Sequence, residues 1–588
     1  MKLFGFWLAL VVLILGSEAF KIVNKQDEKD REKDSYHPSH VTSAEKDFDN
    51  VPEEERTSEF WNNGAQTTLK EKLSKRKQPI AQRPKNVIFF IGDGLSPQTI
   101  AATRMYLGNE NEALSFEKFP YLGQAKTYCV NRQVPDSACT GTAYLSGVKI
   151  NYAMLNVAAS IPRSTCEYQK SNETEIYGIM KWAQEAGKAT GIVTNTRVTH
   201  ASPAAAYAQS ASRSWESDAN VVASRCDPSR TIDIARQLVE NDVPSKFKVI
   251  LGGGRREFRP NGYLDEENYA ARRLDGRDLI KEWVGKHEAL GETRYVWNRT
   301  ELMDVDASKT EYLMGLFEGS HMRFNVQNQA GNRPELEPTL EDMTQKAIEM
   351  LQKYDDGYVL FIEGGQIDLA HHATYARISL DETAEYSKAI AKARSMTSEE
   401  DTLIVVSADH SHTMMYNGYP DRGQDVLGIA GISSQDRLPY TTLSYANGPG
   451  WANTYTPENR AIRQDISDFN FNSISLQYPA TVPLDSETHG AEDVNVYASG
   501  PYSHIFVGNY EQSALPHLMA YASGIGAYLE RDDDNTTISD TDFIIENSAF
   551  DIESARFRIH NSRFRIHNSQ FRINDSVFKI RDADFEIQ

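Results

Sequence analysis

The sequence predicts an α/β fold in which helices flank both faces of a central, mostly parallel sheet. Short, continuous apolar runs are typical of strands buried on both faces, and helical stretches separate these runs. Acidic or histidine residues follow several of the runs directly. Because ligands of open parallel sheets bind beyond the carboxyl ends of the strands, these residues predict a functional site there. The 588 residues, 40% of them hydrophobic, can fill one large domain with insertions and tails.

Residues 1–19 predict a secretory signal, because a basic start precedes an apolar run and a small-residue end at Ser17-Glu18-Ala19. An uncleaved anchor is the alternative, although the apolar run is short for a bilayer. We therefore expect a secreted, extracellular chain that can form disulfides. Four cysteines allow three pairings, between which the sequence alone does not choose, and three glycosylation sequons agree with secretion: Cys129, Cys139, Cys166 and Cys226, and Asn172, Asn298 and Asn535.

The charge pattern bears on partners and on the N-terminal leader. A formal net charge of −21 disfavours a nucleic-acid binder, which needs a basic face. Residues 20–80 are highly charged and weakly apolar, which is typical of an acidic, partly disordered leader. Within it, residues 59–77 predict a helix that lies on the body of the protein or on a partner subunit.

The apolar runs place the strands. The first run, residues 87–91, ends at Gly92-Asp93-Gly94, and an acid between two glycines at a strand end is a poor choice for stability. An ordinary turn would explain one such acid, but the later runs end in the same manner. Those runs are residues 189–193, 247–251, 358–362 and 402–406, and helices are expected over residues 175–186 and 340–354.

Ser137, in the turn Val134-Pro135-Asp136-Ser137-Ala138, is the candidate nucleophile. A serine hydroxyl needs a base or a metal to remove its proton, and the chain lacks the G-x-S-x-G elbow of serine hydrolases. Neutral imidazole with carboxylate is the ligand set of catalytic zinc, while oxygen ligands suit magnesium. Asp368 and His372 are four residues apart, so they face one side of a helix. The pattern indicates a metal-activated serine.

Six motifs in series resemble those of the alkaline phosphatase family, above all its animal branch. The similarity runs from about Lys85 to about Tyr528. The resemblance implies hydrolysis of phosphate monoesters at alkaline pH through a phosphoserine at Ser137. The motifs are Asp93-Gly94, Pro135-Asp136-Ser137-Ala138, Arg197-Val198-Thr199-His200-Ala201-Ser202-Pro203, Glu363-Gly364-Gly365 with Asp368 and His372, Ala408-Asp409-His410-Ser411-His412, and Glu487-Thr488-His489-Gly490.

The resemblance also implies ligands for two zinc ions and one magnesium ion. One zinc is implied at Asp368, His372 and His489, the second at Asp93, Asp409 and His410, and magnesium at Asp93, Ser202 and Glu363. His200 and His412 are implied to orient ligands or waters, and Arg213 is implied to bind the phosphoryl group. A calcium site is implied at the Phe317 carbonyl, Glu318 and Glu337, with one more acid near Asp265.

Further implications concern the architecture. The family implies a homodimer and a main domain over residues 81–530, with a small crown-like domain inserted at about 418–485. It implies that Cys166 pairs with Cys226, and so that Cys129 pairs with Cys139. Around Asp368 three residues differ from those common in vertebrate relatives, and since none is a ligand we expect them to tune the pH optimum: Gln366, Leu369 and Ala370.

Residues 531–588 form a tail in which Phe recurs every seven residues from Phe543 to Phe585, usually as Phe-x-Ile. Within each Phe-x-Ile the two apolar residues are two positions apart, a spacing that fits one face of a strand and not a coiled-coil seam. Stacked short strands and a disordered array both remain open. No apolar segment ends the tail, so we expect no lipid anchor.

We predict a secreted, metal-dependent phosphomonoesterase. A diesterase or sulfatase of the same superfamily is one alternative, but Arg213 with the full ligand set favours monoesters. A catalytically idle surface or matrix protein that acts through its repeat tail is the other. No ligand is missing from the sequence, which disfavours the idle protein.

Overall fold

The computed structural model describes residues 53–74, 80, 82–331 and 335–529, and six strands between residues 543 and 586. The chain divides into two compact units, Met1–Gly526 and Ala527–Gln588. The expected signal and most of the expected leader lie outside the described residues. Within these ranges no helix is both long enough and apolar enough to cross a bilayer.

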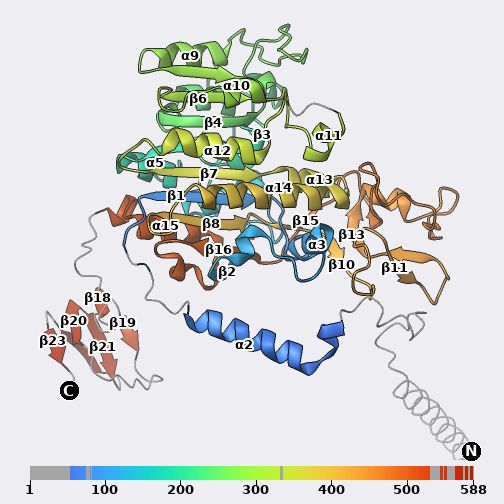
Figure 1. The fold of residues 1–588 in the computed structure, drawn as a ribbon. Helices are drawn as coiled ribbons and strands as arrows, with labels where there is room; N and C mark the ends of the chain where they lie inside the picture. The colour runs from blue at the N-terminus through green and yellow to red at the C-terminus, as the bar shows by residue number, and fades with distance from the viewer. Residues whose placement is uncertain are drawn as a thin grey trace, which may run out of the picture. The chain divides into compact units, whose positions relative to one another are not determined.

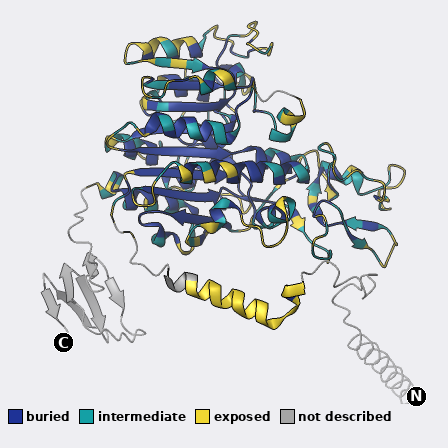
Figure 2. Ribbon diagram, viewed as in Figure 1, coloured by how far each residue is buried: buried dark blue, intermediate teal, exposed yellow. Residues whose placement is uncertain are grey.

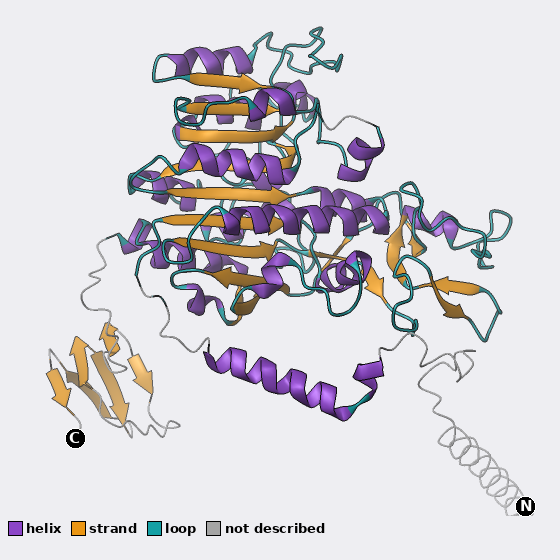
Figure 3. Cartoon of the chain, viewed as in Figure 1, coloured by secondary structure: helices purple, strands orange, loops and turns teal. Residues whose placement is uncertain are grey.

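A ten-stranded sheet forms the centre of the first unit (Figure 1, Figure 3). Its strands run in the order β17-β2-β16-β8-β1-β7-β3-β4-β6-β5, and all neighbours are parallel except β16, which is antiparallel to β2 and β8. The expected mostly parallel α/β fold is confirmed. The strands are β1 Asn86–Gly92, β2 Tyr121–Lys126, β3 Ala189–Arg197, β4 Phe247–Gly253, β5 Thr293–Val296, β6 Tyr312–Leu316, β7 Tyr358–Gly364, β8 Thr402–Ala408, β16 Val494–Ser499 and β17 Gly508–Glu511.

Strand β1 lies between β7 and β8, and every residue of these three strands is buried (Figure 2). Continuous apolar runs favour this central position, because both faces of the strand are covered. The three strands also end in register: Gly92 is opposite Gly364 on one side and Ala408 on the other. Asp93 and Asp409 therefore leave the sheet side by side.

Two groups of helices cover the sheet. Helices α12 (Leu340–Leu351) and α14 (Ala376–Ser395) contact each other and strands β1, β3, β4 and β7, while α4 (Ser137–Ser146), α5 (Ile179–Glu185) and α15 (Leu515–Ser523) contact one another and strands β1, β3 and β7. The remaining helices are α2 Ser58–Ser74, α3 Pro97–Leu107, α6 Ala201–Ala204, α7 Asp218–Ala223, α8 Ile234–Glu240, α9 Leu279–Glu288, α10 Arg299–Met303, α11 Asn325–Ala330 and α13 Gln366–His372.

The helix expected over residues 340–354 is observed as α12, but the one expected over 175–186 is wrong at its start. Glu175 forms an isolated β-bridge with Val157, which takes its backbone out of the helical conformation, and α5 begins only after Gly178. Helix α2 is exposed at every position from Ser58 to Lys70 (Figure 2). Its exposed side chains include the apolar Phe60, Trp61 and Leu69.

One of the three expected glycosylation sites has a structural role. The Asn298 side chain caps α10, where its oxygen accepts a hydrogen bond from the Glu301 N–H at 2.8 Å and its amide donates to the Glu301 carboxylate at 3.0 Å. Because Asn298 is buried and its amide nitrogen is engaged, this sequon is a poor acceptor for a glycan.

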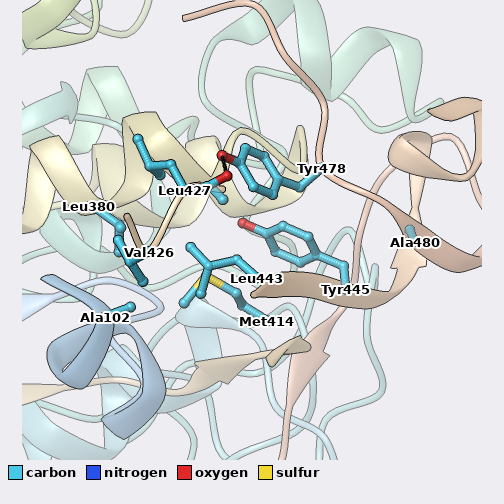
Figure 4. Packing of buried hydrophobic residues seen from close by; sticks show 10 residues of the cluster. Ala102, Leu380, Met414, Val426, Leu427, Leu443, Tyr445, Tyr478 and Ala480 are labelled. Carbon is cyan, nitrogen blue, oxygen red and sulfur yellow. Dashed lines mark hydrogen bonds between the residues drawn. The ribbon is translucent and has the colours of Figure 1, made fainter. Parts of the chain in front are cut away.

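The segment between β8 and β16 carries small sheets of its own. Strands β10 (Met414–Tyr416), β13 (Leu443–Gly448) and β14 (Ala480–Pro483) form one sheet, β11 (Ile429–Ile432) pairs with β12 (Pro439–Thr441), and β9 (Ser411–His412) pairs with β15 (His489–Gly490). The segment packs on α3 and α14 through a buried cluster that includes Ala102, Leu380 and Met414 (Figure 4).

Both implied disulfides are present. Cys129 pairs with Cys139 across a Cα–Cα distance of 5.8 Å, and Cys166 pairs with Cys226 across 5.4 Å. The first closes a short loop that contains the turn around Ser137.

The strands described in the second unit form two three-stranded sheets. One sheet has the order β18-β20-β23 and the other β19-β21-β22. The repeated phenylalanine positions are in register: Phe543, Phe564 and Phe585 align in the first sheet, and Phe550, Phe571 and Phe578 in the second. The strands are β18 Phe543–Glu546, β19 Ala549–Asp551, β20 Arg563–His567, β21 Ser569–Ile573, β22 Ser576–Ile580 and β23 Ala583–Glu586.

Candidate active site

Ser137 is the first residue of α4 and is buried. The free N–H groups of a helix N-terminus carry partial positive charge, which favours an anion at this position. The Ser137 hydroxyl is directed to the end of the central strands, with Oγ 3.4 Å from Asp93 Oδ1 and 3.2 Å from His410 Nε2. The serine therefore lies next to the acid that follows β1 and the histidine that follows β8.

Lone pairs converge around the His410 ring. Its Nδ1 is 3.2 Å from the Ser411 carbonyl, to which it can only donate, so Nε2 carries the lone pair of a neutral ring. Burial lowers the pKa of His410 well below its usual value, which agrees with a neutral ring. His410 Nε2 lies 3.1 Å from Asp409 Oδ2 and 3.3 Å from Asp93 Oδ1. Three electron-pair donors this close, beside Ser137, fit a bound cation.

A second convergence involves two more histidines and Asp368. His372 Nδ1 donates to the Glu487 carbonyl at 2.6 Å, and His489 Nδ1 donates to the Pro135 carbonyl at 2.8 Å. Their Nε2 lone pairs then face each other across 3.1 Å, near the roughly 3.3 Å expected for two nitrogens on one tetrahedral zinc. Asp368 oxygens lie 3.4 Å from His372 Nε2 and 3.3 Å from His489 Nε2. This donor set fits zinc.

Three oxygens form a third group on the other side of Asp93. Asp93 Oδ2, Ser202 Oγ and Glu363 Oε1 are buried and form no hydrogen bond of standard geometry with the described residues, although Ser202 lies close enough to Glu363 to interact with it. The other Glu363 oxygen accepts hydrogen bonds from the hydroxyls of Thr194 and of Thr196, the latter at 3.1 Å. Buried polar atoms normally have a partner. An all-oxygen group of this kind fits magnesium.

The raised pKa values of the acids in these groups also fit bound cations. Burial, with the nearby charge of Asp368, raises the pKa of Asp93 well above its usual value and that of Asp409 to about 6. Burial also raises the pKa of Glu363 to about 7. Bound cations reverse this effect, because they favour the ionised carboxylates.

His412 lies among the candidate ligands, but both of its ring nitrogens are engaged by carboxylates. Its Nε2 is 2.7 Å from Asp368 Oδ1 and its Nδ1 is 2.5 Å from Glu487 Oε2, so both nitrogens donate and no lone pair remains. Although burial opposes the charge, Glu487 and Asp368 raise the pKa of His412 to about 10. Gly94 makes room for this ring: at φ +72° it has the conformation glycine favours, and a Cβ there would lie 2.3 Å from His412 Cδ2.

Arg213 is held on two sides beside Ser137. Its Nη1 donates to Asp136 Oδ2 at 2.9 Å and its Nη2 donates to His200 Nε2 at 2.8 Å. Asp136 also caps α4 and accepts a hydrogen bond from the Ala153 N–H at 2.7 Å. Two of the five guanidinium donors are therefore used for positioning, and the others can bind an oxyanion.

His200 is neutral in this arrangement, because Nε2 accepts from Arg213. Burial and the charge of Arg213 lower the pKa of His200 well below its usual value. The edge of its ring packs against His321, with ring centroids 5.0 Å apart. His200 therefore lies between Arg213 and the group formed with Asp93 and Glu363.

The calcium candidates form a separate cluster. Glu318 and Glu337 are buried, and their carboxylates lie 3.4 Å and 3.2 Å from Arg323 Nε. The acid at Asp265 is paired with Arg255 at 2.9 Å. The Arg323 guanidinium provides positive charge near Glu318 and Glu337, but Glu318 Oε2 and Glu337 Oε1 are buried without a hydrogen bond to any described residue.

The structure brings the candidate nucleophile, Arg213 and all the candidate zinc and magnesium ligands to one end of the sheet. Sequence reasoning assigned no role to Asp136 or to Glu487, although both lie inside motifs that it singled out. It also missed Thr194 and Thr196, which fix Glu363. Thr194 and Thr196 could have been found in the sequence only by their position near a strand end, and this position does not distinguish a ligand from a residue that orients one.

Comparison with known families and sequences gives a consistent result. A family model described as "Alkaline phosphatase" matches residues 84–525. The chain is 44% identical over 506 residues to a membrane-bound alkaline phosphatase of Bombyx mori, with 84% of this chain and 90% of that protein covered. It is 43% identical over 489 residues to the tissue-nonspecific alkaline phosphatase of Gallus gallus, with 81% and 91% covered.

Solved structures share the fold. The alkaline phosphatase of Thermus thermophilus superposes with a TM-score of 0.54 at 24% identity, covering 76% of this chain and 93% of the other. The enzyme of the Antarctic bacterium TAB5 superposes with a TM-score of 0.51 at 21% identity, covering 76% and 99%.

Proposed function

The chain belongs to the alkaline phosphatase family and hydrolyses phosphate monoesters, and we propose that it does so through Ser137, with two zinc ions and one magnesium ion. The observation that carries the proposal is the convergence of neutral histidine lone pairs and carboxylates beside a buried serine at a helix N-terminus. In the proposal Asp368, His372 and His489 hold one zinc. Asp93, Asp409 and His410 hold the other, and Asp93, Ser202 and Glu363 hold magnesium.

When bound, the ions supply Lewis acidity that makes a serine hydroxyl and a water nucleophilic near neutral pH and stabilises the charge on the leaving oxygen. Ser137 Oγ attacks phosphorus in line, so that an Oγ–P bond forms, the P–O bond to the leaving group breaks, and the alcohol departs with a proton. Water then attacks the phosphoserine from the vacated side, the Oγ–P bond breaks, and phosphate leaves while Ser137 regains its proton.

The chain's own residues position these steps. Arg213 donates its remaining N–H groups to the equatorial phosphoryl oxygens, which suits a planar guanidinium. Asp136 and His200 hold the guanidinium in place, and the N-terminus of α4 adds N–H groups at the developing charge. His412 holds Asp368, which is a ligand in this proposal, and Glu487 together.

Two further parts of the proposal concern calcium and assembly. A calcium ion at Phe317, Glu318 and Glu337 is supported by Glu318 Oε2 and Glu337 Oε1, which form no hydrogen bond with the described residues, although the Arg323 guanidinium lies close to both. A homodimer is supported by helix α2, whose exposed apolar side chains need a surface to cover them. Light scattering on the purified chain tests the dimer.

The test of the proposed function compares Ser137→Ala with Ser146→Ala. Ser146 is a buried serine at the other end of the same helix, and its hydroxyl donates to Asn156 Oδ1 at 2.9 Å. We expect the wild type to release p-nitrophenol from p-nitrophenyl phosphate at alkaline pH and to lose this activity with a chelator. The rate of p-nitrophenol release should fall by at least about 10⁴-fold in Ser137→Ala, while in Ser146→Ala it should stay within a few-fold of the wild-type rate.

Metal analysis of the wild type should find two zinc ions and one magnesium ion per chain. Folded, metal-loaded wild type without turnover would contradict the proposal. Faster turnover of bis(p-nitrophenyl) phosphate or p-nitrophenyl sulfate would favour the diesterase or sulfatase alternative.

A further inference from the structure

The inserted segment, residues 414–483, contacts the candidate active site at several points, one of which is a tyrosine hydroxyl. Tyr445, on β13, and Tyr478, just before β14, are both buried in the cluster that joins this segment to α3 and α14 (Figure 4). The Tyr478 hydroxyl donates to the Leu427 carbonyl at 2.7 Å, so its bond stays within the segment. The Tyr445 hydroxyl instead lies 2.9 Å from Nδ1 of His371, on α13.

His371 uses both ring nitrogens away from the candidate zinc ions. Nδ1 meets the Tyr445 hydroxyl and Nε2 lies 3.0 Å from Thr99 Oγ1, on α3. The ring is fully buried and stacks on the His412 ring, with centroids 4.7 Å apart and planes 29° apart. Its two bonds fix the plane of the ring, and the stacked ring limits how far His412 can tilt.

His412 contacts both His371 and the proposed zinc ligand Asp368. It bonds to Asp368 Oδ1 and to Glu487 Oε2, and the Glu487 carbonyl accepts the Nδ1 proton of His372. A tilt of His412 would therefore move one carboxylate of the proposed zinc site and, through Glu487, one imidazole. Groups that orient ligands in this manner commonly change metal affinity by about 10- to 100-fold when they are altered.

We propose that Tyr445 is a positioning residue by which the inserted segment fixes the zinc held by Asp368, His372 and His489, acting through His371 and His412. The inference rests on the proposed assignment of these three residues as zinc ligands. It gives the segment a role in the chemistry, because the segment would order the metal site through a cluster of buried, mostly apolar residues. The chemistry of the contact, one phenol hydroxyl on one imidazole nitrogen, can be removed without a change in volume.

The experiment compares Tyr445→Phe with Tyr478→Phe in the full chain loaded with zinc and magnesium. Each variant loses one buried hydroxyl from the same cluster, so both should lower the melting temperature to a similar extent. We expect Tyr445→Phe to release zinc to a chelator about tenfold faster than the wild type, as read from a zinc indicator, and to lower kcat with little change in KM. Tyr478→Phe should release zinc at the wild-type rate.

A His371→Gln background tests the proposed path. There Tyr445→Phe should change zinc release by less than about twofold, because the contact through which it acts is absent. Equal zinc release from both tyrosine variants would overturn the proposal, whether both match the wild type or both are equally faster. Wild type that holds no zinc would instead contradict the ligand assignment itself.

Discussion

Replacing Asp136 by Asn tests whether this residue holds Arg213, which we propose binds the phosphate group. Asp136 Oδ1 accepts from the Ala153 N–H, and Oδ2 accepts from Arg213 Nη1 at 2.9 Å. An amide keeps the shape and can keep Oδ1 as an acceptor. Its NH₂ group then faces the Arg213 donor and also the Ala138 N–H, which is 3.2 Å from Oδ2, so the charge-assisted bond and one capping bond of α4 are lost while the size of the side chain is almost unchanged.

The size of the expected effect follows from how far Asp136 and Arg213 are exposed to solvent. A hydrogen bond between charged groups contributes roughly 1.5–3 kcal/mol, and about 1.4 kcal/mol corresponds to a tenfold change in an equilibrium constant. The Arg213 side chain is 21% exposed and that of Asp136 is 2% exposed, so water screens the pair in part and we take the lower end of this range. We expect the inhibition constant for inorganic phosphate and the KM for p-nitrophenyl phosphate to rise about 10- to 30-fold.

The control is Glu216→Gln, which removes the charge that binds a different arginine. Glu216 accepts two hydrogen bonds from Arg197, both at 2.7 Å, and the pair is similarly shielded from solvent. Glu216→Gln should leave phosphate inhibition within about twofold of the wild type. If Asp136 acts through Arg213, Asp136→Asn should have little further effect in an Arg213→Ala background. An unchanged phosphate inhibition constant, or the same loss in that background, would refute the reasoning.

Two further predictions concern stability. Arg299 Nε donates to Asp342 at 2.8 Å; burial opposes the effect, but this bond lowers the pKa of Asp342. The bond therefore stabilises the fold fully at pH values above the ordinary Asp pKa of about 4, and its contribution is lost as the pH falls through the lower pKa of Asp342 in the folded chain. Chemical unfolding should therefore show Arg299→Ala destabilised by about 1 kcal/mol at pH 7 and by progressively less below pH 4, and a constant difference would contradict this. Removing the first disulfide as Cys129→Ala with Cys139→Ala should lower the unfolding free energy by about 2–3 kcal/mol, because the loop it closes gains conformational entropy in the unfolded chain. Thermal unfolding at equal metal loading measures the change, and an unchanged melting temperature would show that the disulfide adds no stability.

The sequence by itself determined the central strands and the position of the site. The runs that became β1, β7 and β8 are apolar at successive positions, a pattern that is stable only with both faces covered. Acids at the ends of such runs had to lie at one edge of a parallel sheet, and Asp93, Asp409 and Glu363 do so. The predicted start of α5 was wrong because a β-bridge from Glu175 to Val157, 18 residues earlier in the chain, overrides local helical preference.

Only the tertiary structure decided which polar residues near the site hold others in place. Asp136 bonds to Arg213 and Glu487 to His412, contacts between residues 77 and 75 positions apart in the chain. Such contacts depend on strand order and on the path of long connections, which local sequence patterns do not encode. Tyr445 is the clearest case: its hydroxyl reaches His371 only because an inserted segment folds back onto α3 and α14.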